Sequence, residues 1–137
     1  MSGFLADKSA LARMHQEPVA EAVIRLADQG IVSVCAVTEL EVLFSARNAE
    51  HRRLNKEDLA SSFGWVPMRD DVWKKAEEIQ KALTDTARHR CASVPDLLIA
   101  ATALAQGLTV LHYDRDFDTI AEVTGQPTEW VVPPGTV

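Results

Sequence analysis

Short apolar segments alternate with helical patterns along the chain, and this alternation constrains the fold more than any other feature. The apolar runs at residues 4–6, 31–35, 108–112 and 129–132 are short, and most contain β-branched residues, so we predict that they are strands. A further strand is expected around residues 65–67. The pattern predicts a three-layer α/β/α sandwich around a mainly parallel sheet of about four or five short strands.

The intervals between these strands carry the 3.6-residue period of amphipathic helices. Helices are expected over residues 9–15, 19–29, 38–47, 71–86, 95–106 and 117–123. Gly30 and Gly107 stand where a glycine commonly ends a helix. A polar, basic stretch over residues 47–56 precedes a further short helix through Leu59. The 137 residues contain no linker or internal repeat, so we expect one domain, residues 1–137.

Composition excludes several classes of protein. A hydrophobic fraction of 47% excludes a disordered or collagen-like chain. No apolar run approaches the roughly 20 residues that a membrane span needs, and Asp7 interrupts any early signal-peptide core. Cys35 and Cys91 are too few and too far apart for a disulfide framework or a thiolate metal site. We therefore expect a protein of the reducing cytoplasm, with no membrane partner.

Acidic residues stand at one edge of the predicted sheet. Ligands of parallel sheets bind beyond the carboxyl ends of the strands, near the point where the strand order reverses. Asp7 directly follows the first strand, and Asp114 and Asp116 follow the strand at residues 108–112. Glu41 and Asp96 lie in the first turns of helices that begin at the same edge. Five carboxylates are therefore expected to converge on one cleft.

Each of these acids also has a purely structural interpretation. Asp7, Asp114 and Asp116 can cap the helices that follow them. The segments 38–41 and 93–96 both have the spacing of a capping box. Helix caps are commoner than metal ligands, so no single acid decides between the two interpretations. The recurrence of acids at several strand ends, without basic partners in the same motifs, favours a shared cleft.

Crowded carboxylates favour metal-dependent hydrolysis. They raise each other's pKa, and hard cations such as Mg²⁺ or Mn²⁺ relieve the repulsion. Such ions lower the pKa of a bound water and clamp phosphoryl oxygens. The chain has no Cys/His cluster typical of zinc sites, and it lacks the glycine-rich nucleotide-binding loops and the G-x-S-x-G elbow.

Four segments, in this order, carry a resemblance to a known family. They are Leu5-Ala6-Asp7-Lys8-Ser9-Ala10, Thr38-Glu39-Leu40-Glu41, Pro95-Asp96-Leu97-Leu98-Ile99-Ala100-Ala101 and Asp114-Arg115-Asp116-Phe117. From Phe4 to Trp130, the chain resembles a PIN domain and, more narrowly, the VapC toxins of bacterial type II toxin–antitoxin systems. The P-D-x-x-I-A-A and D-x-D-F elements are the most specific.

The resemblance implies a Mg²⁺- or Mn²⁺-dependent endoribonuclease. We expect its substrate to be tRNA or rRNA, and the sequence leaves mRNA open as well. The resemblance also implies a homodimer and inhibition by a small VapB-like antitoxin. By resemblance, the acidic quartet of the family is matched by Asp7, Glu41, Asp96 and Asp114. Asp116 matches a fifth acid that many members have. Glu41 is preferred to Glu39, because it lies three residues after Thr38 and the two side chains are about 200° apart on a helix.

We expect Asp7, Asp96 and Asp114 to ligate one metal ion. Asp116 and Glu41 are expected to ligate a second ion or to orient water. The chain departs from the common family pattern at Lys8, Ser45 and His112 without losing an acid. We interpret Lys8 as a solvated lysine. His112 is expected to pack at a strand end or to support the site rather than to transfer protons.

RNA also requires positive charge outside the acidic cleft. Two basic segments can supply it, with Arg47, Arg52 and Arg53 in one and Arg88 and Arg90 in the other. Basic segments are also commonly plain solvated surface. The net charge of −6 argues at first against a nucleic-acid partner. Without the five site acids, however, fifteen acidic and fourteen basic residues remain, so the net charge does not exclude an RNA substrate. The alternatives are a non-catalytic α/β binding module and a metal-dependent hydrolase of DNA or phosphomonoesters.

Overall fold

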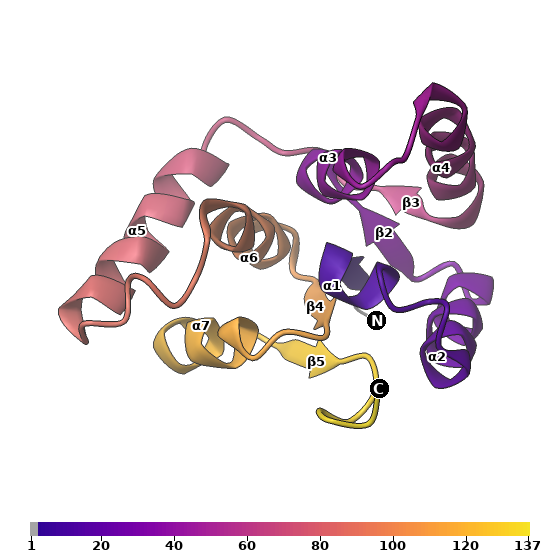
Figure 1. Cartoon of the computed structure of the whole chain (residues 1–137). Helices are drawn as coiled ribbons and strands as arrows, with labels where there is room; N and C mark the ends of the chain where they lie inside the picture. The colour runs from indigo at the N-terminus through magenta and orange to yellow at the C-terminus, as the bar shows by residue number, and fades with distance from the viewer. Residues whose placement is uncertain (1–2) are drawn as a thin grey trace.

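The computed structural model describes residues 3–137 as a five-stranded sheet with helices on both faces (Figure 1). The strands are β1 (Phe4–Ala6), β2 (Val32–Val34), β3 (Gly64–Trp65), β4 (Thr109–His112) and β5 (Thr128–Trp130). The helices are α1 (Lys8–Leu11), α2 (Glu17–Asp28), α3 (Ala36–Phe44), α4 (Ala49–Ser62), α5 (Val72–Asp85), α6 (Val94–Gln106) and α7 (Asp116–Thr124). The predicted fold class is confirmed, and every strand pair is parallel.

The strand order, β3-β2-β1-β4-β5, places the switch point of the sheet between β1 and β4. From β1 the chain moves outward through β2 to β3, and it then returns to the other side of β1 with β4 and β5. Leu5 of β1 is in register with Ser33 on one side and Val110 on the other. The carboxyl ends of β1 and β4 therefore lie side by side at the position where parallel α/β proteins bind ligands.

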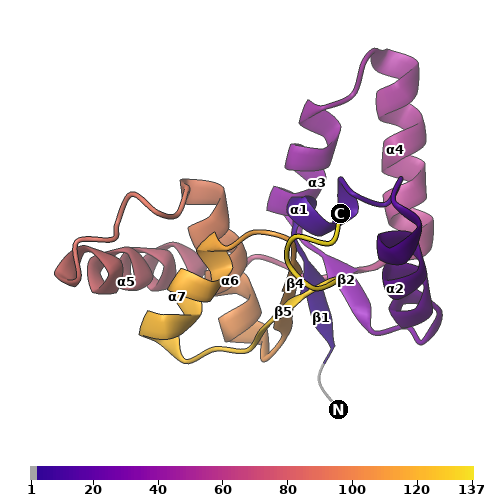
Figure 2. The ribbon, with the colours of Figure 1, turned by 60° about the horizontal axis from the view of Figure 1, so that its bottom comes forward.

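The two faces of the sheet are covered differently, as two views of the ribbon show (Figures 1 and 2). The helices α5, α6 and α7 pack on one face around the larger core, in which Leu5 and Val110 point away from the second face. Most of α6 is buried, because it lies between the sheet and α5. The opposite face carries α1 and α2 over a smaller core that includes Val19, Val23 and Leu111. Alternate strand residues thus serve opposite faces.

Helix α4 is the clearest departure from the sequence prediction. The structure has one helix of 14 residues over most of the polar stretch that was expected to precede a short helix. Only Leu59 of this helix is buried, so no apolar period reveals it. The Asn48 side chain instead accepts a hydrogen bond from the His51 amide at 2.8 Å, which caps the helix. Within residues 3–137, no helix is both long and apolar enough to cross a membrane.

Candidate active site

The five acids expected at the carboxyl edge of the sheet line one pocket of about 580 Å³. They come from four separate parts of the chain: Asp7 after β1, Glu41 on α3, Asp96 on α6, and Asp114 and Asp116 after β4. The parallel sheet gathers them, since it brings the ends of β1 and β4 and the starts of α6 and α7 to the same edge. Glu41 lies in the second turn of α3 and not in the first turn as predicted, because this helix begins at Ala36.

Asp7 is both a helix cap and a pocket residue. Its side chain is 3% exposed, and Oδ2 accepts a hydrogen bond from the Ser9 amide at 2.9 Å, at the start of α1. The other oxygen, Oδ1, is buried and has no hydrogen-bond donor among the described residues. An unpartnered buried carboxylate oxygen is costly unless something outside the chain satisfies it. The cap therefore leaves one oxygen of Asp7 for a ligand.

Asp96 combines the same two roles. The predicted capping box is present: the Asp96 amide donates to Ser93 Oγ at 3.3 Å, and Asp96 Oδ2 accepts from the Ser93 amide at 3.2 Å. This fixes the carboxylate at the first turn of α6, where it is 9% exposed. Since a cap uses one oxygen, the structural and the ligand interpretations are compatible.

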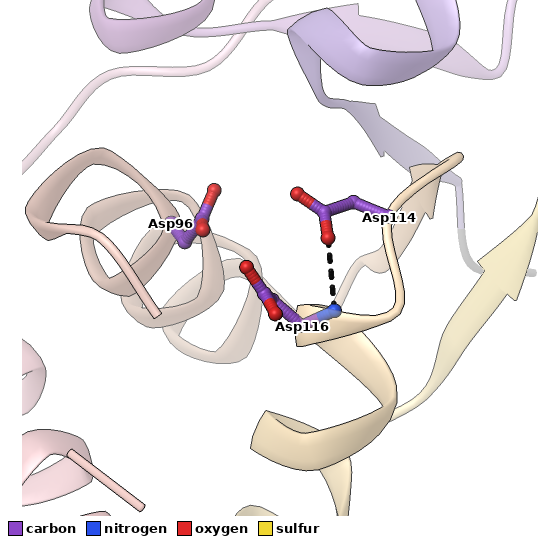
Figure 3. A group of neighbouring side chains, drawn as sticks. All are labelled: Asp96, Asp114 and Asp116. Atoms are coloured by element: carbon purple, nitrogen blue, oxygen red, sulfur yellow. Dashed lines mark hydrogen bonds between the residues drawn. The ribbon is translucent and has the colours of Figure 1, made fainter. Parts of the chain in front are cut away.

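Asp114 and Asp116 complete a tight group with Asp96. Oxygen atoms of these three carboxylates lie within 4.8 Å of one another, and Figure 3 shows the side chains pointing toward one another. The Asp116 amide donates to Asp114 Oδ1 at 2.9 Å, which holds the turn between β4 and α7. The expected first-ion set was Asp7, Asp96 and Asp114; the closest trio contains Asp116 where Asp7 was expected.

Helix α3 presents Glu41 to the pocket and turns Glu39 away from it. Glu39 Oε1 accepts from Lys56 Nζ of α4 at 3.1 Å. Thr38 does not cap the helix, because α3 begins at Ala36 and the Thr38 hydroxyl donates to the Ala6 carbonyl at 2.8 Å. The capping-box interpretation of residues 38–41 is therefore wrong. The hydrogen bond from Thr38 instead ties α3 to the end of β1, one residue before Asp7.

His112 supports the loop that carries Asp114. It is fully buried, and its Nδ1 accepts a hydrogen bond from the Asp114 amide at 3.1 Å. The ring packs against Phe117 and Trp130, with centroids 5.1 and 5.0 Å away. Burial lowers the pKa of His112 to about 4. The imidazole is therefore neutral near pH 7, as befits a supporting residue.

Four of the five acids have a raised pKa. Burial raises the pKa of Asp96 to about 7, with further contributions from the charges of Asp7 and Asp114. Burial is also the first cause of the raised pKa of Asp7, followed by the charge of Asp114. Burial and the charge of Asp7 raise the pKa of Glu41, and burial and Asp114 raise that of Asp116. The pocket therefore favours bound protons or a bound cation over bare carboxylates.

The residues present fit a hard divalent cation. All five acidic donors are carboxylates, the ligand type that Mg²⁺ and Mn²⁺ prefer, and the Asp96, Asp114 and Asp116 oxygens are close enough together to surround one ion. The unpartnered Oδ1 of Asp7 offers a further donor. A cation there would relieve the repulsion that raises the carboxyl pKa values.

The basic residues expected to bind RNA lie elsewhere. Arg52 and Arg53 are on α4 and Arg47 precedes it, whereas Arg88 and Arg90 are in the loop between α5 and α6. None of the five lines the acidic pocket as residues 3–137 form it. Arg53 pairs with Glu50 and Glu57 of its own helix, and Arg88 pairs with Glu122.

Sequence reasoning missed two cationic residues that do line the pocket, Arg13 and Arg115. Arg115 lies inside the D-x-D motif, which was interpreted only for its acids. Arg13 stands four residues after Ser9, and that spacing places the two on the same face of a helix. Both signals are present in the sequence but are weak when taken alone.

Carboxylates that converge beyond the switch point of a parallel sheet define a class of α/β proteins whose acidic pocket is suited to a divalent metal ion. Within this class, the chain belongs to the PIN domain family, whose model matches residues 4–123.

Close relatives narrow the assignment. The chain is 44% identical to Ribonuclease VapC21 of Mycobacterium tuberculosis over 133 residues, which is 97% of this chain and 96% of the relative. It is 46% identical to Ribonuclease VapC2 of the same organism, over 92% of this chain and 90% of the relative. The protein is thus an enzyme, a nuclease of the VapC type.

Solved structures share the fold at low sequence identity. VapBC2 from Rickettsia felis, bound to a DNA fragment from its promoter, has a TM-score of 0.77 and 13% identity, over 92% of this chain and 96% of that one. DNA-bound VapBC from Salmonella typhimurium has a TM-score of 0.76 and 18% identity, over 96% of this chain and 100% of that one.

Proposed function

We propose that this protein is a Mg²⁺- or Mn²⁺-dependent endoribonuclease that acts in the cytoplasm as the toxin of a toxin–antitoxin pair. Its substrate is tRNA or rRNA, whose cleavage stops translation. One observation carries the proposal: five carboxylates from four parts of the chain line a single pocket beyond β1 and β4, and three of them approach within 4.8 Å. The names of the VapC relatives support RNA as the substrate.

The five acids have different roles in this proposal. Asp96, Asp114 and Asp116, with Asp7 beside them, hold the metal, and Glu41 orients water from the α3 side of the pocket. When bound, the metal supplies Lewis-acid activation of water and of a phosphoryl oxygen. Water adds to phosphorus and the bond to O3′ breaks, so that the products are a 3′-hydroxyl and a 5′-phosphate.

The surface outside the pocket is compatible with protein partners. A groove of about 680 Å³ between α2, α3 and α4 is lined by apolar side chains that include Val23, Ile24 and Leu59. It suits an apolar helical segment of a VapB-like antitoxin, in keeping with the VapBC assemblies that share this fold. On α3, Phe44 is 92% exposed and Leu40 is 63% exposed, and we assign this face to a homodimer contact.

The basic segments provide a path for RNA beyond the pocket. Arg47, Arg52 and Arg90 are exposed and form no ion pair among the described residues, so they remain available to phosphates. Arg53 and Arg88 must first exchange their carboxylate partners, Glu50 and Glu57 for the former and Glu122 for the latter. We therefore expect the three exposed arginines to contribute more to RNA binding than the two paired ones.

Cleavage mapping of total cellular RNA tests the proposal. Wild type with Mg²⁺ should cut a small set of sites with 5′-phosphate ends, and Asp96→Asn or excess EDTA should abolish the cuts. Asparagine keeps an oxygen acceptor for the Ser93 amide, so the variant should remain folded. A 2′,3′-cyclic phosphate product would contradict the mechanism, and full activity of Asp96→Asn would contradict the site.

Parallel assays separate the alternative functions. Single-stranded DNA and a phosphomonoester, incubated under the same conditions, should not be hydrolysed at a comparable rate. Preference for either substrate would favour a different metal-dependent hydrolase. A protein that neither cleaves RNA nor gains thermal stability from Mn²⁺ would instead be a binding module whose acids serve only as caps.

A further inference from the structure

Arg13 is a cationic side chain held at the rim of the acidic pocket. It lies two residues after the end of α1 and lines the pocket together with Asp7 and the segment around Asp114. The ion pairs formed within residues 3–137 involve Arg53, Lys56, Lys75, Lys81 and Arg88, and Arg13 is not among them. Its charge is therefore not neutralised by a neighbouring carboxylate, although the pocket beside it is lined with acids.

Two contacts fix the Arg13 guanidinium. Nη1 donates a hydrogen bond to the Ser9 carbonyl at 2.8 Å, and the central carbon lies 4.5 Å from the centroid of the Tyr113 ring. Stacking on an aromatic ring holds a guanidinium in one plane while leaving its edge accessible. The contact with Ser9 occupies one nitrogen, so the remaining N–H groups stay available for an external acceptor.

Ser9 connects Arg13 to the metal-binding acids. Its amide donates to Asp7 Oδ2 at 2.9 Å, its hydroxyl accepts from the Tyr113 amide at 2.9 Å, and its carbonyl accepts from Arg13. Tyr113 is the residue before Asp114. One serine thus sets the position of the guanidinium relative to the carboxylates on both sides of the switch point.

The Tyr113 ring is itself held from two sides. Its hydroxyl accepts a hydrogen bond from the Gly135 amide at 2.8 Å and donates to the Val137 carbonyl at 3.2 Å. The ring also meets Trp130 edge-on, with centroids 5.2 Å apart and planes at 86°. These contacts hold the aromatic surface against which Arg13 packs.

We propose that Arg13 binds a phosphate of the RNA substrate at the rim of the acidic pocket, and that Tyr113 is the positioning residue that holds it there. This inference rests on the proposed function, since it takes RNA as the substrate. A nucleic-acid backbone that enters a pocket of carboxylates needs a cation beside them, and a planar guanidinium suits the paired oxygens of a phosphate.

The other two cations that line the pocket are less suited to this role. Lys8 faces Glu41 closely enough to oppose the rise in the pKa of that carboxyl. Arg115 is exposed, and none of the aromatic or hydrogen-bonding contacts found within residues 3–137 hold its guanidinium. Of the three, only Arg13 has a charged group that is held by a hydrogen bond and an aromatic ring and that forms no ion pair within residues 3–137.

RNA binding without cleavage tests the role of Arg13. In the Asp96→Asn background, the affinity for a short labelled single-stranded RNA is measured by fluorescence anisotropy over a series of salt concentrations. Arg13→Gln should raise Kd about tenfold and should reduce the slope of log Kd against log salt by about 0.7. The matched control is Arg25→Gln, because Arg25 is exposed near the end of α2, at the opposite edge of the sheet, and should change neither quantity.

Cleavage kinetics test the positioning role of Tyr113. In the otherwise wild-type enzyme, Tyr113→Leu should raise KM toward the value of Arg13→Gln with little change in kcat, since the ring is lost. Tyr113→Phe keeps the ring and loses the contacts to residues 135–137, so its KM should rise less. Arg13→Lys should recover only part of the affinity, because an ammonium group lacks the planar fork.

Two results would overturn the inference. If Arg13→Gln leaves Kd and the salt slope unchanged, Arg13 does not bind a phosphate of the RNA, even if the wild-type protein cleaves RNA. A fall in kcat without a rise in KM for Tyr113→Leu would assign this residue to the acidic site instead. A wild-type protein that binds RNA but never cleaves it would contradict the proposed function, while the binding comparison would still decide the role of Arg13.

Discussion

The pocket beyond β1 and β4 and the surface of α4 contain the same kinds of charged residue in opposite arrangements. On α4, Arg53 lies between Glu50 and Glu57, with Nη1 2.8 Å from a Glu57 oxygen, and Lys56 reaches Glu39. The hydrogen bond from Arg53 lowers the pKa of Glu50. In the pocket, acids are gathered with other acids, and burial raises the pKa of four of them.

The difference shows that charged residues stabilise a helix when they pair locally, and form a candidate binding site when the fold gathers charges of one sign. The charge of Arg53 on α4 is satisfied by acids three and four residues away, and such exposed pairs mainly support the helix. Charges in the pocket are brought together by the sheet and lack basic partners of that kind, so they need a cation from outside the chain. A high density of charged residues along the sequence therefore does not by itself mark the active site.

Removing a charge should have its largest effect at the centre of the pocket. We expect Asp114→Asn to reduce metal-dependent cleavage by at least about 100-fold, because one of the proposed metal ligands is lost. Asparagine retains an acceptor for the Asp116 amide, so the turn after β4 should persist. Carbon-detected NMR titration should also show the pKa values of Asp7, Asp96 and Asp116 falling, because the charge of Asp114 contributes to raising each of them.

The matched control lies on α4. Glu57→Gln removes a carboxylate that pairs only with an exposed arginine, and it should leave cleavage unchanged. Equal losses of activity in Asp114→Asn and Glu57→Gln would break the distinction between the two regions.

The pH dependence of stability provides the next largest effect. The pKa of Asp96 rises from 3.8 to about 7 on folding, so the metal-free folded state binds more protons between these pH values, and this carboxyl destabilises the fold as pH rises. His112 acts in the opposite direction, because its pKa falls to about 4. Comparing wild type with Asp96→Asn cancels the contribution of His112.

We therefore expect Asp96→Asn to melt near the wild-type temperature at pH 4 and about 5 °C above it at pH 8, both in EDTA. Excess Mn²⁺ at pH 8 should reverse the order, because the metal stabilises the wild-type carboxylates. Differential scanning calorimetry measures both series. A difference that does not change with pH would show that neither burial nor the neighbouring charges raise the pKa of Asp96.

The smallest effect is expected at His112. In His112→Phe the ring still packs against Phe117 and Trp130, but the acceptor for the Asp114 amide is lost. We expect cleavage to fall about tenfold, as for other groups that orient metal ligands, with little change in melting temperature. Metal titration by calorimetry should show weaker Mn²⁺ binding. Unchanged affinity and activity would restrict His112 to a packing role.

Much of the site follows from the sequence, because a parallel sheet fixes where its strand ends and helix starts meet. That rule identifies Asp7, Asp96 and Asp114 without knowledge of side-chain geometry. The choice of Glu41 over Glu39 follows from the spacing of the family motif after Thr38, and helical rotation adds only that both cannot face one site. The structure turns Glu39 toward Lys56 and places Glu41 in the pocket.

The remaining features depend on contacts that no local pattern encodes. Helix α4 is held by a cap and ion pairs and buries only Leu59. Its sequence therefore has no apolar period from which the helix could be predicted. The packing of Arg13 on Tyr113 joins residues one hundred positions apart, and neither belongs to a recognisable motif on its own. Thr38 matches a capping box by spacing, whereas its hydroxyl in fact reaches the Ala6 carbonyl.

The pairing of β1 with β4 also means that the acidic pocket is incomplete until most of the chain has been synthesised. The carboxylates come from positions 7 to 116, and the strand that brings Asp114 beside Asp7 spans Thr109–His112. Contacts this distant along the chain are slow to form, because a long loop must close before they can be made. A partly synthesised chain on the ribosome already contains Asp7 and Glu41 but still lacks Asp114 and Asp116. The proposed activity toward RNA therefore requires that residue 116 has been synthesised and that β4 has paired with β1.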